Sequence, residues 1–134
     1  MIEITERAIN VSKVLQSILA KEAGALAHFI GTIRKEEEIS GLFYECYPGM
    51  AQKTLEKIST EAKKKWPLFK ISIVHRYGWV GLGEPSVVIA VSSAHRKEAF
   101  EACQFIIDQI KERVPIWKRG LPAREERFAY AENQ

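Results

Sequence analysis

The sequence predicts a single α+β domain spanning residues 1–134, with a mainly antiparallel sheet and three principal helices. A chain of 134 residues suits one domain with a core of its own. Hydrophobic residues make up 46% and charged residues 28%, which is ordinary for a globular chain and argues against disorder. The apolar periodicities follow the order β-α-β-β-α-β-β-α, and strands that come as hairpins favour antiparallel pairing.

The first half of the chain predicts a helix, two strands and a second helix, at residues 11–20, 25–34, 42–47 and 48–65. Either Asn10 or Ser12 can cap the first helix, because both side chains accept hydrogen bonds from free backbone N–H groups. Pro48 suits the first turn of the second helix, and Pro67 closes it. The two strands are joined by a short charged loop, so we expect a hairpin.

The second half predicts two strands, a helix and a mixed tail, at residues 69–80, 86–92, 96–113 and 117–134. Gly78 breaks the first of these strands, and residues 81–85 predict a turn. Residues 86–92 are almost continuously apolar, which is typical of a central strand. The tail is expected to hold one short strand near Phe128.

Periodicity also predicts the core. The side chains expected to be buried are Phe29, Val88, Val91, Phe100 and Ile107. The helix over residues 48–65 is expected to bury Met50, Leu55, Ile58 and Ala62.

The bulk properties exclude several classes of protein. A net charge of +3 does not predict nucleic-acid binding, although it allows a local basic pocket. Two cysteines, Cys46 and Cys103, are expected to be reduced apolar residues, and no ligand spacing for a metal is present. The chain shows no signal peptide and no apolar run that could span a bilayer, so the expected compartment is the cytoplasm.

Cations gather where the strand over residues 86–92 meets the following helix. His95, Arg96 and Lys97 stand in a row at the helix N-terminus, where backbone N–H groups favour anions and cations oppose the helix dipole. Such a local conflict predicts an anion site, although a solvated first turn is the simpler alternative. Arg34 ends an earlier strand, and a charge at a strand end is commonly only the edge of the fold.

Two lysines flank the helix break at Pro115. Lys111 lies in the last helical turn, where a cation suits the dipole without any function, and Lys118 follows Trp117. If these lysines approach each other, repulsion favours loss of a proton from one ammonium group, which then acts in acid–base chemistry. Alone, each lysine is most simply a surface charge.

His75 and Arg76 lie within a predicted strand, so one of them must face inward. We interpret them as a buried, hydrogen-bonded structural pair.

Taken together, the ordered motifs resemble the catalytic subunit of molybdopterin synthase, the MoaE family. The resemblance covers roughly residues 24–128. It is carried by residues 24–25 (GA), 29–34 (FIGTIR), 44–50 (YECYPGM), 73–78 (IVHRYG), 91–96 (VSSAHR), 99–102 (AFEA) and 114–119 (VPIWKR).

The resemblance implies a sulfurtransferase. In this family a small ubiquitin-like partner, similar to MoaD, inserts a C-terminal Gly-Gly thiocarboxylate into a pocket of the catalytic subunit. Sulfur passes to cyclic pyranopterin monophosphate, and two transfers form the dithiolene of molybdopterin. The family also implies a homodimer within a heterotetramer, with no cofactor and no metal. Substrate phosphate and thiocarboxylate are both anions, so a cationic pocket fits this chemistry.

By motif match, Lys111 and Lys118 take the catalytic positions. The residues that take substrate-binding positions are Thr32, Ile33, Arg34, His95, Arg96, Arg119 and Gly120. The family usually has an acidic residue where Gly120 stands, so that carboxylate is absent or replaced by Glu125 or Glu126.

Two alternatives remain open at this point. One is a non-catalytic α+β binding module, which would need basic and aromatic residues spread over an open sheet face. The other is an inactive scaffold paralogue, supported by Gly120 and the short tail. Whether the pocket is shared across a dimer is not decided by the sequence.

Overall fold

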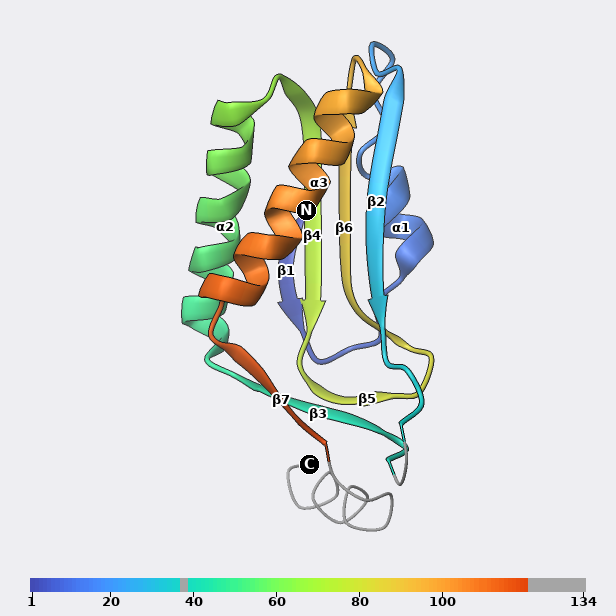
Figure 1. Ribbon diagram of the computed structural model, residues 1–134, viewed down its shortest axis with the longest axis vertical. Coiled ribbons are helices and arrows are strands. Elements are labelled where there is room, and N and C mark those ends of the chain that lie inside the picture. The colour runs from blue at the N-terminus through green and yellow to red at the C-terminus, as the bar shows by residue number, and fades with distance from the viewer. Residues whose placement is uncertain (37–38, 121–134) are drawn as a thin grey trace.

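The computed structural model describes residues 1–36 and 39–120 and shows two sheets with three helices (Figure 1). The larger sheet has the order β1-β4-β6-β2, formed by Ile2–Thr5, Leu68–Arg76, Pro85–Ser93 and Ala25–Thr32. The smaller sheet has the order β5-β3-β7, formed by Gly78–Gly81, Gly41–Cys46 and Ile116–Gly120. The helices are α1 (Val11–Gln16), α2 (Pro48–Lys65) and α3 (Arg96–Arg113). The predicted α+β class with three helices is confirmed.

Strand pairing is antiparallel except at one edge. β6 pairs antiparallel with both β4 and β2, and both pairings in the smaller sheet are antiparallel. β1, which is the strand that opens the predicted order, runs parallel to β4. The prediction that residues 86–92 form a central strand is confirmed, since β6 lies between β4 and β2 and is buried from Ser86 onwards.

The larger sheet has a core on each face. Helices α2 and α3 cover one face, and α1 lies on the other (Figure 1). Side chains alternate between the faces along each strand. On β4, Ile73 packs toward α2 and α3. Its neighbour Val74 packs on the other face, against Val14 of α1 and Ile18, which follows α1.

The predicted bounds of α2 and α3 are confirmed, and α1 is shorter than predicted. Asn10 caps α1 by accepting the Lys13 N–H at 3.1 Å, which selects it over Ser12. The helix ends at Gln16. The hydroxyl of the next residue, Ser17, donates a hydrogen bond to Val14 O and also contacts the hydroxyl of Ser72 on β4. Local hydroxyl bonds of this kind compete with helix continuation.

The predicted core was partly wrong. Val88 and Val91 are fully buried, but Phe100 is 66% exposed, Phe29 is 38% exposed and Met50 is 63% exposed. Helix α3 instead buries Ala99, Ala102, Cys103, Ile106 and Ile110. The prediction had placed Phe100 and Ile107 on the buried face. The observed buried face begins one residue earlier, at Ala99, with the same spacing of three and four residues, so periodicity alone cannot choose between the two faces. Ile107 is partly buried.

Gly78 separates two strands of different sheets. Its φ of +83° is a left-handed conformation that glycine adopts without steric cost, and it turns the chain from β4 into β5. The predicted break in residues 69–80 is therefore a change of sheet. The predicted short strand near Phe128 lies outside the described residues and stays a prediction. A further strand, β7, lies at Ile116–Gly120.

Both cysteines are free, and Cys103 is buried, in agreement with the predicted apolar role. No helix in the described part of the chain is both long and apolar enough to cross a membrane.

Candidate active site

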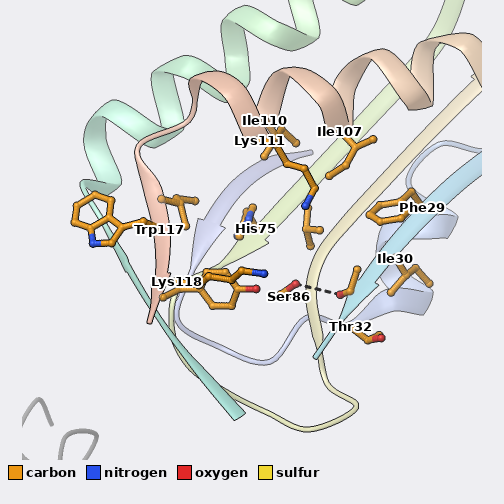
Figure 2. A pocket seen from close by; sticks show the side chains of 14 residues that line it. Phe29, Ile30, Thr32, His75, Ser86, Ile107, Ile110, Lys111, Trp117 and Lys118 are labelled. Carbon is orange, nitrogen blue, oxygen red and sulfur yellow. Dashed lines mark hydrogen bonds between the residues drawn. The ribbon is translucent and has the colours of Figure 1, made fainter. Parts of the chain in front are cut away.

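A pocket of about 650 Å³ lies where the C-terminal half of α3 passes over the junction of the two sheets (Figure 2). Its volume falls within the range of small-molecule sites. The residues that line it come from α3 and five strands: Phe29, Ile30, Gly31, Thr32, Tyr44, His75, Ser86, Val87, Ile107, Ile110, Lys111, Ile116, Trp117 and Lys118. Both predicted catalytic lysines are among them.

Helix geometry places Lys111 in this pocket. Ile107, Ile110 and Lys111 are three and four residues apart, so they share one face of α3, and that face covers the pocket. Val114 ends the helix just beyond, where its N–H bonds to Ile110 O. Figure 2 shows the side chain of Lys111 pointing down from the helix into the hollow.

Strand geometry places Lys118 opposite. On β7, Ile116 and Lys118 share one face and Trp117 takes the other. The Trp117 indole donates to Glu45 Oε2 at 3.0 Å and packs on Tyr47, with ring centroids 5.5 Å apart. The Trp117 indole therefore anchors β7 at the pocket rim through Glu45 and Tyr47, and Lys118 reaches the pocket next to its register partner Tyr44.

The pocket is cationic. Its described lining includes Lys111 and Lys118 but no aspartate or glutamate. Two ammonium groups without a carboxylate among these lining residues favour anionic ligands. The structure thus brings together the two lysines that the sequence placed on either side of Pro115.

His75 was missed as a pocket residue. It is 7% exposed, and its Nδ1 lies 2.9 Å from the carbonyl oxygen of Arg76. Burial lowers the pKa of His75 to about 4; the nearby charge of Lys111 acts in the same direction, and the bond to Arg76 opposes it. Strand alternation could have found His75, since it follows Ile71 and Ile73 on the β4 face that α3 covers.

Arg76 has the structural role that the sequence predicted. It is 9% exposed, and its Nε donates to Glu6 O at 3.1 Å. Its guanidinium also pairs with Glu84, which accepts the Gly81 N–H at 2.7 Å. Arg76 therefore holds the turn between β5 and β6, while its neighbour His75 lines the pocket.

The segment at the end of β2 divides between pocket, core and solvent. Thr32 lines the pocket, and Ile33 is 3% exposed, with its backbone bonded to Gly83 and Glu84. The side chain of Arg34 is 88% exposed and pairs with Glu36 at 3.3 Å. Arg34 is therefore outside the pocket of its own chain.

His95 and Arg96 lie at the opposite end of α3 from Lys111. Both are exposed, and His95 occupies the N-cap position without a side-chain cap. At about 1.5 Å per residue, Arg96 lies about 22 Å along the helix from Lys111. The substrate-binding positions that the family resemblance gave to Arg34, His95 and Arg96 therefore do not lie together within a single chain.

The reason lies in the pairing of β2 with β6. Ser93, two residues before His95, pairs with Ala25 at the start of β2, whereas Arg34 lies two residues beyond the end of that eight-residue strand. The two ends of such a strand are about 24 Å apart. The roles predicted for these cations stay predictions.

Arg119 and Gly120 lie on β7, where their backbones pair with Phe43 and Leu42. Their side-chain environment, with Glu125 and Glu126, lies outside the described residues. The role predicted for this segment stays a prediction.

These features define a class of protein: an α+β chain with a cationic, lysine-lined pocket between a helix end and two sheets. The chain belongs to the MoaE protein family, whose model matches residues 4–113.

The relatives agree in sequence and fold. The molybdopterin synthase catalytic subunit of Thermoplasma volcanium is 48% identical over 123 residues, covering 90% of each chain. The crystal structure of molybdopterin synthase from Staphylococcus aureus superposes with a TM-score of 0.86 at 38% identity, covering 90% of each chain. A complex of subunits 1 and 2 of molybdopterin-converting factor from Helicobacter pylori gives 0.78 at 29% identity, covering 90% of this chain and 84% of that one.

Proposed function

We propose that this chain is the catalytic subunit of a molybdopterin synthase, an enzyme of molybdenum cofactor biosynthesis, and that it acts as a sulfurtransferase. The observation that carries the proposal is the convergence of Lys111 and Lys118 in one pocket of a MoaE family member. The substrate we propose is cyclic pyranopterin monophosphate, and the product carries the dithiolene of molybdopterin.

The pocket suits the charges of this reaction. The incoming thiocarboxylate and the substrate phosphate are anions, and the tetrahedral intermediates of acyl chemistry carry an oxyanion. An ammonium group at Lys111 or Lys118 can pair with these anions and can donate the proton that a leaving group needs. Ile107, Ile110 and Ile116 add apolar wall to the pocket, and an ion pair formed against such a wall is stronger than one in open water.

We propose that sulfur arrives on a small ubiquitin-like partner with a C-terminal Gly-Gly thiocarboxylate. The Helicobacter pylori relative was solved as a complex of two subunits, which supports a two-subunit assembly here. Two glycines without side chains would allow the extended tail to pass between α3 and β7.

A second copy of the chain would bring together Arg34, His95 and Arg96, which lie apart within one chain. β2 is an edge strand of the larger sheet within the described residues. If β2 pairs antiparallel with β2 of another copy, Arg34 of one copy lies beside His95 and Arg96 of the other, because Ser93 pairs with Ala25 at the strand start. Three cations would then extend the lysine pocket into a phosphate site, as expected for a homodimer within a heterotetramer.

The assay for this proposal uses purified chain, thiocarboxylated small subunit and cyclic pyranopterin monophosphate, with the dithiolene product as readout. Product should form only when all three are present. A partner that lacks its terminal Gly-Gly should still dock but give no product. If the complete mixture yields no dithiolene, the alternative of an inactive scaffold is favoured.

The proposed site of the reaction is the cytoplasm. Two free cysteines fit a reducing compartment. Fractionation of cells that produce the chain at its natural level would test this location.

A further inference from the structure

His75 lines the pocket of Lys111 and Lys118, and one of its ring nitrogens, Nδ1, is already hydrogen-bonded. Its Nδ1 lies 2.9 Å from the carbonyl oxygen of Arg76. A carbonyl oxygen only accepts hydrogen bonds, so Nδ1 carries the proton. In the neutral ring, Nε2 is then a hydrogen-bond acceptor.

The surroundings keep that acceptor neutral. Burial, with a smaller contribution from the charge of Lys111, lowers the pKa of His75 to about 4 against the opposing hydrogen bond to Arg76. Among the described residues that line the pocket, the ionisable neighbours of the ring are Lys111 from α3, Lys118 from β7 and Tyr44 from β3. None of these is a carboxylate that would stabilise an imidazolium.

A neutral acceptor solves a specific problem of an anion pocket. A lysine side chain is flexible, and a carboxylate that oriented it would also cancel the charge that attracts the substrate. An imidazole nitrogen can orient an ammonium group without neutralising it. An ammonium group has three N–H donors, so one can bond to the ring while the other two remain for an anion.

We propose that His75 is a positioning residue for Lys111: its Nε2 accepts a hydrogen bond from the Lys111 ammonium group and directs that group into the pocket. Both side chains line the same pocket, Lys111 from α3 and His75 from β4 (Figure 2). No hydrogen bond joins them in this structure, so the proposed contact needs a rotation of the flexible lysine side chain. This inference rests on the proposed function of Lys111, and it concerns a residue other than the cations and backbone positions already assigned to the site.

Two substitutions separate positioning from a purely structural role. In His75→Asn the side-chain amide can still donate to Arg76 O, but it is too short to replace Nε2. In His75→Gln the amide reaches the position of Nε2 and loses the Arg76 bond. Positioning predicts that Asn lowers kcat by about ten- to a hundredfold, the range of one hydrogen bond to a charged group, and that Gln recovers a larger share of the rate. The reverse order would overturn the proposal.

A double-mutant cycle tests the route of the effect. In a Lys111→Ala background, His75→Asn should change the residual rate by less than about twofold, because the partner is already absent. A full additional loss would show that His75 acts independently of Lys111 and would overturn the proposal.

A measurement without substrate keeps the inference separate from the proposed function. Nitrogen-15 NMR of wild-type protein at pH 7 should show His75 protonated at Nδ1, with Nε2 accepting a hydrogen bond. Lys111→Ala should shift the Nε2 resonance toward the value of a free acceptor. An unchanged resonance would overturn the proposal even if the enzyme is active. If instead the wild-type chain makes no dithiolene while the resonance shifts, the contact stands and the proposed function fails.

Discussion

The ring of Tyr44 meets the imidazole of His75 edge-on, with centroids 5.7 Å apart and planes at 73°. This contact joins β3 of the smaller sheet to β4 of the larger one. Because Tyr44 is also the register partner of Lys118, the same contact holds β7 at the pocket. An aromatic pair between the sheets therefore helps to set the separation of Lys111 and Lys118, the two lysines proposed as catalytic.

Loss of this pair should affect both stability and rate. Tyr44→Leu removes an edge-on aromatic contact, which is worth about 1 kcal/mol beyond its buried area. We expect a lower free energy of unfolding in urea and a lower rate of dithiolene formation, since β7 is less firmly held. Tyr44→Phe, the matched control, keeps the ring and should retain the stability. Equal stability of the Leu and Phe variants would contradict this role.

Lys111 should be the most sensitive residue of the chain. Lys111→Ala should change the free energy of unfolding by no more than about 0.5 kcal/mol, because the side chain is exposed at a helix end. The rate should fall at least about a hundredfold, the scale for losing a positioned acid–base group. Lys111→Arg keeps the charge but does not readily release a proton, so it should not rescue the rate. An Arg variant that works at nearly the wild-type rate would leave Lys111 as an electrostatic anchor and favour Lys118 for the chemical step.

A site shared between two copies predicts complementation. Arg34→Ala and Arg96→Ala homodimers should each be nearly inactive, since each lacks one cation at both sites. In a mixed dimer, one site receives both substitutions and the other receives neither. Unfolding and refolding the two variants together should therefore restore part of the activity, at most about a quarter of wild type from random assortment. Activity that stays at the level of the separate variants would exclude the shared site.

His75 should make stability depend on pH. Its pKa is about 4 in the folded chain, below the ordinary histidine value of about 6.5, so between these values the unfolded chain binds a proton that the folded chain does not. The free energy of unfolding should therefore fall as pH drops from about 6.5 to 4, by up to about 3 kcal/mol, and this contribution should level off below pH 4. Urea denaturation at a series of pH values measures the slope. His75→Asn should flatten this slope, and an unchanged slope in that variant would contradict the assignment to His75.

Features that act on their neighbours in the chain were predicted well. Pro48, Pro67 and Pro115 bound α2 and α3, because proline removes an N–H donor and restricts the residue before it. The continuous apolar run of β6 indicated a central strand for a similarly local reason, since both of its faces need apolar side chains. The same local signals placed Lys111 at a helix end and Lys118 just after the break.

Which residues share a surface depended instead on contacts between distant parts of the chain. Two stripes on α3 had equal periodicity, and only packing against β2 and β6 selected Ala99 over Phe100. His75 became a pocket residue because α3 and β3 both approach β4 at that point. Arg34 and Arg96 were separated because antiparallel pairing of β2 with β6 puts them at opposite ends of one strand. A sequence carries the charge and shape of each side chain, whereas the distance between two of them arises from the pairing of the strands that carry them.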